Sequence, residues 1–289
     1  MDDVLSGAES IEEAITALQQ LRNLLNRGGF PICKWCSNSP EFLSTIPEQE
    51  RELSMQLHER NINSIIKVLG LLWDPNTDLL YIAHQISPLT GACVTKRHIY
   101  SQIAKNFDPT GLVAPVLVLA KLFAQRMWQL KMNWDDPIDS TLRHEWCELE
   151  NNLTELQSIS IPRCVTNQAA TEYEIHGFAD ASNMAYGACI YIRCLLTDGS
   201  AKMNLLTSKS KLAPLRDLSI PRKELCAALL LARLMDRVVP AINISAKEVI
   251  LTTCGAVASW YLKFDQRVEA TILAVKCEVD REEDYLSMC

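Results

Sequence analysis

HGFADASNMAYGACIYIR, residues 176–193, is the stretch that decides the fold. Small or apolar residues alternate with His176, Phe178 and Asp180, a Ser-Asn turn follows, and an apolar run continues to Tyr191. Two such runs around a turn predict a pair of antiparallel strands. Asp180 would then end the first strand, where a carboxylate can face a divalent cation across an open site. Simple turn chemistry is the alternative interpretation of this Asp.

A second informative run, residues 205–234, leads from a third strand candidate into a helix. Ser219-Ile220-Pro221 precedes the helix, and proline is favoured at such a start. Glu224 is therefore expected in the first turn, where its carboxylate can point beside Asp180. Strand, hairpin, third strand and a helix opening with Glu is the order in which ribonuclease H assembles half of its metal site.

The resemblance to a known family is carried by FADAS, LLTSKSKLAPL and SIPRKELCAALLLARL. These strings resemble the ribonuclease H region of BEL/Pao long-terminal-repeat retrotransposons. Upstream, KVLGLLWDP, TKRHIYSQIAKNFDPTGLVAPV and LKMNWDDPI resemble the same Pol polyprotein between the polymerase palm and the ribonuclease H. The resemblance is collinear from Met1 to about Trp260 and implies a fragment of a retrotransposon Pol polyprotein.

The resemblance implies that Asp180 and Glu224 are catalytic metal ligands, filling two of four carboxylate positions. The family reads Thr-Asp-Ser at the third position, whereas this chain has Thr253-Cys254-Gly255. A cysteine cannot replace a carboxylate for Mg²⁺, which prefers hard oxygen ligands. The fourth carboxylate has no single candidate. Mg²⁺ or Mn²⁺ is therefore the expected cofactor, incompletely coordinated.

The first residues, MDDVLSGAESIEEAI, are similar to the Y-x-D-D hairpin of reverse transcriptase and the helix after it. By this resemblance Asp2 and Asp3 would be catalytic and hold the two metals of a polymerase. A polymerase also needs a third carboxylate and template-binding fingers from earlier in the chain. Because neither precedes Met1, no polymerase activity is expected.

The expected fold is α+β or α/β and multidomain, since 289 residues with 48% hydrophobic content suit two to three modules. Residues 1–92 would be the end of a reverse transcriptase palm, with a helix from residue 11 to Gly28 and strands at 30–35, 68–73 and 79–82. Residues 93–160 would form a helical thumb and connection of three helices. Residues 170–289 would form a ribonuclease H-like mixed sheet with helices, incomplete at its C-terminus.

Positive charge is concentrated although the net charge is −7. Residues 95–131 contain six cations and one acid, and residues 200–237 contain eight cations and three acids. Either cluster alone suits a solvated helix face, but two clusters flanking a metal site favour a track for a phosphate backbone. The expected partner is an RNA:DNA hybrid or other nucleic acid, with other Pol segments as further candidates. The nucleic-acid-binding candidates are Lys34, Trp35, Lys96, Arg97, Lys209, Lys211 and Arg222.

The protein is expected to be intracellular, in the cytoplasm or the nucleus, and not secreted. No association with a membrane is expected. The eleven cysteines suit core thiols in a reducing compartment. Cys33 and Cys36 form a C-x-x-C that could be half of a zinc site or a redox pair, but no second pair accompanies them.

Three functions are consistent with these patterns. The first is two-metal hydrolysis of the RNA strand of an RNA:DNA hybrid, impaired by the missing ligand. The second is a non-catalytic remnant that binds nucleic acid or a partner. The third is an aspartic peptidase, because this region is often labelled Pao retrotransposon peptidase. Such enzymes need Asp-Thr-Gly or Asp-Ser-Gly, and the chain has only Asp198-Gly199-Ser200.

Overall fold

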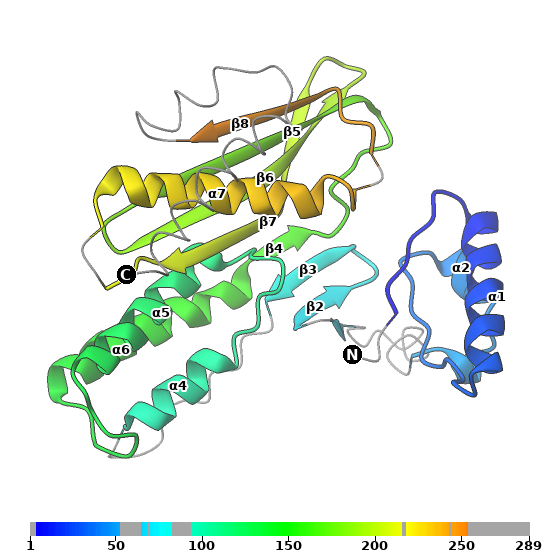
Figure 1. The fold of residues 1–289 in the computed structure, drawn as a ribbon. Helices are drawn as coiled ribbons and strands as arrows, with labels where there is room; N and C mark the ends of the chain where they lie inside the picture. Colours follow the sequence, from blue (N-terminus) through cyan, green and yellow to red (C-terminus); the bar gives the residue numbers. More distant parts are fainter. Residues whose placement is uncertain are drawn as a thin grey trace. The chain divides into compact units, whose positions relative to one another are not determined.

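The computed structural model describes residues 4–52, 65–68, 70–82, 94–215, 218–242 and 244–253. Two compact units divide the chain (Figure 1). Unit 1 comprises Met1–Ala83 with Gln157–Arg163, and unit 2 comprises His84–Leu156 with Cys164–Cys289. The predictions for Asp2, Asp3 and Cys254 lie outside the described residues.

Unit 1 begins with a helical part. Helix α1 (Ile11–Arg27) starts at Ser10, whose side chain accepts a hydrogen bond from Glu13 N, and ends at Gly28, as predicted. Helix α2 (Pro40–Ser44) and the 3-10 turn η1 (Glu48–Glu50) follow. Leu18 of α1 packs with Leu43 and Ile46 in a small buried cluster.

Unit 1 also contains an antiparallel sheet in the order β1-β2-β3-β4. Its strands are β1 (Ile66–Val68), β2 (Leu71–Asp74), β3 (Leu79–Ile82) and β4 (Ser160–Pro162). The last strand arrives from far along the chain and is fixed by Arg163, which donates to both carboxylate oxygens of Asp78 at 2.6 and 3.0 Å. This return explains why residues 157–163 belong to unit 1.

Two strand predictions in this part were wrong. The expected strand at 68–73 is two strands, because Gly70 has φ +86° and reverses the chain between β1 and β2. The expected strand at 30–35 is absent apart from an isolated bridge between Trp35 and Arg51. Pro31 lacks an N–H donor, and Lys34 has φ +61°, so this segment does not suit a continuous ladder.

Unit 2 contains the three predicted helices, α4 (Lys96–Ala104), α5 (Ala114–Gln129) and α6 (Ser140–Glu155). The 3-10 turn η3 (Leu156–Ser158) follows α6, and its last two residues belong to unit 1. Thr95 and Asp139 cap α4 and α6 with their side-chain oxygens. The helices share a core in which Ile99, Met127 and Trp146 are fully buried. The ring centroids of Phe123 and Trp146 lie 5.6 Å apart.

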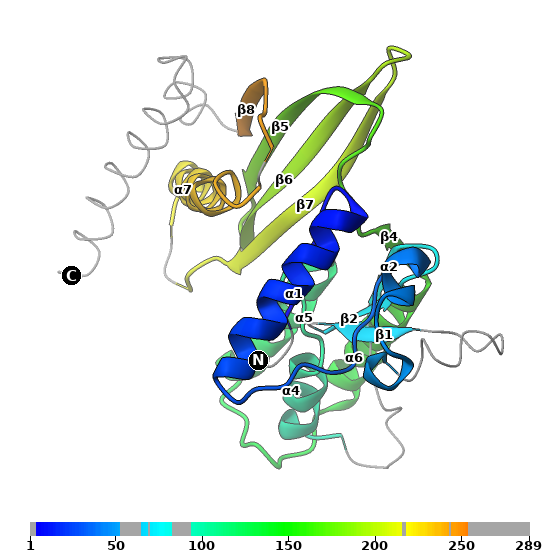
Figure 2. The same ribbon diagram turned by 90° about the vertical axis from the view of Figure 1, so that its right-hand side faces the viewer.

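The second part of unit 2 is a mixed sheet in the order β7-β6-β5-β8 (Figure 2). Strands β5 (Ala170–Ala181), β6 (Ala185–Leu196) and β7 (Ala201–Leu212) form an antiparallel meander. Helix α7 (Ile220–Val238) then leads to β8 (Glu248–Thr253), which lies parallel to β5. The prediction of a mixed α/β fold with a mostly antiparallel sheet in this region is confirmed.

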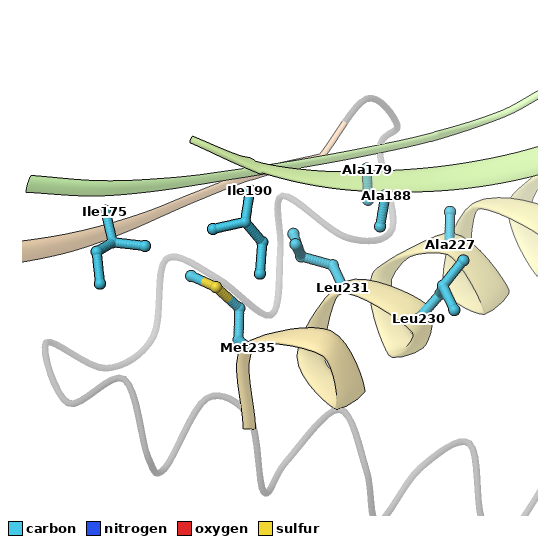
Figure 3. Close-up of a cluster of buried hydrophobic side chains, with 8 residues drawn as sticks. All are labelled: Ile175, Ala179, Ala188, Ile190, Ala227, Leu230, Leu231 and Met235. Carbon is cyan, nitrogen blue, oxygen red and sulfur yellow. The ribbon is translucent and has the colours of Figure 1, made fainter. Parts of the chain in front are cut away.

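Helix α7 covers one face of this sheet because its apolar stripe faces the small and branched residues of β5 and β6 (Figure 3). Gly177 allows the close approach, since a Cβ there would lie 2.9 Å from Leu231 Cδ1. The buried cluster consists of Ile175, Ala179, Ala188, Ile190, Ala227, Leu230, Leu231 and Met235. Burial of such side chains contributes about 1.5–3 kcal/mol for each large one.

The loop before α5 docks on the free edge of β7. Ser208 N and Thr207 Oγ1 donate to Thr110 O at 3.0 and 2.7 Å, and Ser208 Oγ donates to Gly111 O. Asp108 accepts from Leu112 N and Val113 N, each at 2.9 Å, and thus satisfies amides ahead of α5. The loop protects an edge strand that would otherwise expose unpaired groups.

The helices in the described part of the chain are all too short or too polar to cross a membrane.

Candidate metal and nucleic-acid site

Asp180 is the penultimate residue of β5 and lies at the strand end, as predicted. It pairs with Gly187 of β6, and its side chain is exposed. Ala179 faces α7, so alternation directs Asp180 toward the opposite face of the sheet. One carboxylate oxygen accepts from Ala181 N at 2.8 Å. The position leaves an accessible carboxylate at the rim of the sheet.

The prediction that Glu224 lies in the first turn of α7 was wrong, because it lies just beyond that turn. The helix starts at Ile220 with Pro221 as its second residue, so Glu224 is the fifth residue and no acidic side chain lies in the first turn. The prediction placed the helix start too late, because proline can occupy the second helical position as well as precede a helix. Glu224 is half-buried. That its carboxylate faces Asp180 stays a prediction.

Lys223 ties the start of α7 to the end of the β5–β6 hairpin. Its side chain is 7% exposed, and Nζ donates to Asn183 O at 3.0 Å. Asn183 lies in the turn that follows Asp180 and Ala181. The first turns of α7 and the end of β5 therefore belong to the same corner of unit 2.

Two predicted phosphate-binding lysines lie at the same end of the sheet as Asp180. Lys209 pairs with Ala188, and Lys211 pairs with Tyr186, the residues on either side of Gly187 in β6. The lysines are thus two strands from Asp180, roughly 10 Å across the sheet at about 4.8 Å per strand. Both are exposed, and alternation places them on the α7 side.

Arg222, in the first turn of α7, is exposed as well. With Lys209 and Lys211 it adds positive charge on the α7 side of the sheet.

Of the predicted ribonuclease H metal ligands, Asp180 and Glu224 lie in the part of the chain that the structure describes. Nowhere in the described ranges do three His, Cys, Asp or Glu side chains gather closely enough to hold a metal ion. The parallel register of β5 and β8 extends to Ala179 and Thr253. Asp180 and Cys254 follow these two residues in the sequence, and Cys254 lies outside the described part.

The remaining binding candidates lie elsewhere. Lys34 is exposed, whereas Trp35 packs against the cluster of α1 and α2 with Arg22 over its ring at 6.0 Å. Lys96 is only 2% exposed, so its ammonium is enclosed rather than presented to solvent. Arg97 is exposed and donates to both oxygens of Asp135 at 2.7 and 2.9 Å. These contacts raise the pKa of Arg97 and lower the pKa of Asp135.

The two other short motifs have ordinary structural contacts. Asp198-Gly199-Ser200 forms the turn between β6 and β7, with Ser200 N donating to Asp198 Oδ1 at 2.8 Å and Gly199 at φ +82°. Hydrogen bonds from Ser200 lower the pKa of Asp198. Cys33 and Cys36 are not disulfide-bonded, and neither belongs to a metal-ligand cluster of the described residues.

The sequence profile of a family described as Pao retrotransposon-like RNaseH-like domain matches residues 95–253. The match covers more than half of the 289 residues. The chain belongs to this Pao family. The resemblance to BEL/Pao retrotransposons is thereby confirmed, and the description of the family as RNaseH-like agrees with the order of strands and helix around Asp180.

Two solved structures are similar to this Pao chain at low identity. One is the foamy viral protease-reverse transcriptase dRH in complex with double-stranded DNA, with a TM-score of 0.44 and 11% identity over 95% of this chain and 42% of that chain. The other is the foamy viral protease-reverse transcriptase with double-stranded DNA, with a TM-score of 0.35 and 12% identity over 70% of this chain and 39% of that one. Both TM-scores are below 0.5. No curated protein matches the sequence significantly.

The role of Lys223 in this Pao chain was not predicted from the sequence. A lysine at the start of a helix is usually read as surface charge. Its spacing to Ala227 and Leu230, four and seven residues later, is the signal that places it on the buried stripe of α7.

A second cluster that was missed lies on the sheet face opposite α7. Glu174 accepts from Arg193 at 2.7 Å and contacts His176 at 3.0 Å, with only 12% of the Glu174 side chain exposed. Arg193 first, and then His176, lower the pKa of Glu174. The cross-strand pairing of Glu174 with Arg193 becomes visible only when the hairpin register is known.

Proposed function

We propose that this chain is the reverse transcriptase and ribonuclease H region of a Pao retrotransposon Pol polyprotein. It binds RNA:DNA hybrids, and its ancestral chemistry is two-metal hydrolysis of the RNA strand, impaired here by an incomplete ligand set. The observation that carries the proposal is the corner of unit 2 where the end of β5, bearing Asp180, meets the start of α7, bearing Glu224. Lys223 joins these two elements through Asn183.

The two carboxylates suit a hard divalent cation. Asp180 is exposed at a strand end, and Glu224 is half-buried beside a lysine that is itself engaged by a backbone carbonyl. Asp180 and Glu224 would be the residues that bind Mg²⁺ or Mn²⁺. Such an ion, when bound, supplies charge that activates water and steadies the leaving oxygen of a phosphodiester.

Nucleic-acid binding is supported by charge near this corner. Lys209 and Lys211 lie on β7 at the end of the sheet that bears Asp180, but on the α7 face, the same side as Arg222 and Glu224 of α7. Cations placed beside a carboxylate site can bind the phosphates that flank a scissile bond. They carry no base-reading geometry, so binding should be indifferent to sequence.

The test restores the third carboxylate in the full chain. Cys254→Asp should produce Mg²⁺-dependent cleavage of a labelled RNA:DNA hybrid, whereas the unchanged chain should cleave very slowly or not at all. Cys254→Asn is the matched control, because it has nearly the same shape without the charge. Glu224→Gln on the Cys254→Asp background should remove the recovered cleavage.

A second measurement separates binding of the ion from turnover. Electron paramagnetic resonance of Mn²⁺ should show more bound ion for Cys254→Asp than for Cys254→Asn. Strong cleavage by the unchanged chain would show that the third ligand is elsewhere. If Cys254→Asp gains neither ion nor cleavage, the placement of a third ligand at position 254, together with Asp180 and Glu224, is refuted.

A non-catalytic nucleic-acid-binding protein is the second candidate. Lys209, Lys211 and Arg222 are exposed and do not depend on a metal ion for their charge. This function predicts hybrid binding that is unchanged by EDTA and by Glu224→Gln. The aspartic peptidase is not proposed, because Asp198-Gly199-Ser200 forms a hairpin turn without the required order of residues.

A further inference from the structure

Three aromatic rings form a compact cluster between α4 and the C-terminal end of α5. The ring centroids of Trp128 and Trp134 lie 5.9 Å apart with an interplanar angle of 84°. Tyr100 lies edge-on to both, at 6.4 Å from Trp128 and 5.4 Å from Trp134. The Tyr100 hydroxyl donates to Ala124 O at 2.7 Å, so this ring is anchored to α5.

Lys96 fixes the two tryptophans from the inner side. Its Nζ lies 4.0 Å from the centroid of Trp128 and 5.1 Å from that of Trp134, and donates to Met132 O at 3.0 Å. Desolvated cation–π contacts of this kind are among the stronger ones. Because Lys96 is 2% exposed, the ring faces it contacts point inward, and the exposed ring area lies on the other side.

The tryptophans are nevertheless open to solvent. Trp128 is 56% exposed and Trp134 is 41% exposed. Ordinary core packing does not account for two large rings that pack on a buried lysine and are left half uncovered. Rings restrained before binding lose little conformational entropy when a flat ligand stacks on them.

One lysine lies on the same face of α5 as Trp128, and a second lies just beyond the helix end, where Lys131 has φ +51°. Lys121 lies seven residues before Trp128, which is two helical turns or about 10 Å along the axis. Lys131 follows three residues after Trp128. Both lysines are exposed and form no ion pair with another described residue. Arg97 lies 5.8 Å from the Trp134 centroid but is already paired with Asp135.

We propose that Trp128 and Trp134 form a stacking platform for unpaired bases of single-stranded nucleic acid, with Lys121 and Lys131 contacting the adjoining phosphates. Aromatic faces beside a line of cations are the recurrent means of binding single strands without reading sequence. A duplex cannot use the platform, because its bases are already stacked on each other. The site goes beyond the hydrolysis proposed above and does not depend on its metal ligands.

The size of the patch argues against a protein partner. The exposed fractions of the two rings add up to about one tryptophan, roughly 150–250 Å² of area. A stable protein interface needs about 800 Å² from each partner. A base needs only one ring face, and the flanking lysines favour a polyanion.

Fluorescence anisotropy of labelled oligo(dT) and oligo(U) tests the platform in the full chain. The double variant Trp128→Leu, Trp134→Leu should bind single strands roughly 5- to 150-fold more weakly, the range expected for loss of stacking on one base. Leu119→Ala is the matched control, because Leu119 is a 49% exposed apolar residue of α5 away from the rings. The control should bind like the unchanged chain, and none of these variants should alter binding of a blunt RNA:DNA duplex.

Because Trp128 also contacts Lys96, its replacement by leucine could disturb folding. Phenylalanine variants, which keep an aromatic ring, control for this effect. Trp128→Phe with Trp134→Phe should retain most of the binding. Oligo(dT) should quench tryptophan fluorescence of the unchanged chain and quench the Phe variant less. Equal single-strand binding by the Leu variant overturns the proposal, as does an equal loss of duplex binding. Sedimentation that shows self-association abolished by the Leu variant would identify a second copy as the occupant instead.

Discussion

Replacing Gly111 by alanine should detach the loop before α5 from the edge of β7. Gly111 has φ +75°, and a Cβ there would lie 1.7 Å from Ser208 O and 2.5 Å from Ser208 C. These are backbone atoms of a strand that is paired on its other side with β6, so they cannot move aside. The loop must withdraw instead.

The loss of stability in Gly111→Ala can be worked out from the hydrogen bonds that the docked loop makes. Thr110 O accepts from Ser208 N and Thr207 Oγ1, and Gly111 O accepts from Ser208 Oγ. Their loss should lower the free energy of unfolding by about 3 kcal/mol at about 1 kcal/mol each. An alanine that kept the left-handed conformation would add about 1–2 kcal/mol.

Gly199→Ala is the matched control, because Gly199 also has positive φ, +82°, but has no atom within 4 Å of its Cβ position. It should lose only about 1–2 kcal/mol. Both changes restrict the unfolded chain equally, so this contribution cancels in the comparison. Urea unfolding gives the two free energies, and hydrogen exchange of residues 201–212 reports on β7 itself. The docking argument is refuted if Gly111→Ala costs no more than Gly199→Ala.

Three further outcomes can be checked with single substitutions or pairs. Arg193 and His176 lower the pKa of Glu174. The contribution of Glu174 to the free energy of unfolding is therefore present above its unfolded pKa of about 4.3 and is lost as the pH falls through the folded pKa. In acid titrations followed by circular dichroism, Glu174→Gln should lose less stability than the unchanged chain below about pH 4. Gly177→Ala should cost about 1–3 kcal/mol by overpacking against α7, whereas Gly187→Ala, with its nearest atom at 3.4 Å, should change thermal stability little; equal effects would contradict the packing. The logarithm of the hybrid-binding constant should fall linearly with the logarithm of the salt concentration. The double variant Lys209→Gln, Lys211→Gln should reduce the size of this slope by about 1–2. An unchanged slope would mean that these lysines do not contact phosphates.

Local sequence patterns predicted much of unit 2, because its strands show two-residue alternation and its helices show helical periodicity. Two-residue alternation located β5 and β6, and the apolar residues that recur between Leu225 and Met235 located α7. The position of Asp180 at a strand end follows from the turn that comes after it. The exact turn of Glu224 could not be obtained in this way, because proline is compatible with more than one position at a helix start.

Other features depend on contacts between distant residues, which periodicity does not encode. The strand at 30–35 was overestimated because apolar and aromatic residues were counted without the positive φ of Lys34. The partner of Lys96 was missed for a different reason: a lysine in a basic cluster suggests phosphate binding, and only the fold brings Trp128 and Trp134 around it.

For the three helices before the sheet, the sequence pattern predicts the helices, and the structure adds which surface they contact. Helical periodicity predicts α4, α5 and α6 but does not say which surface these helices contact. The division of residues 93–160 into a domain of their own therefore stays a prediction. The structure gathers these helices and the sheet into unit 2, joined at Thr110 and Gly111. The family match has nearly the same extent, since it begins at Thr95, the cap of α4, and ends at Thr253, the last residue of β8. Because the loop is docked on β7, the strand that bears Lys209 and Lys211, detaching it should disturb the phosphate-binding edge as well as stability. Weaker hybrid binding by Gly111→Ala under conditions where the chain remains folded would therefore connect the helices to the function of the sheet.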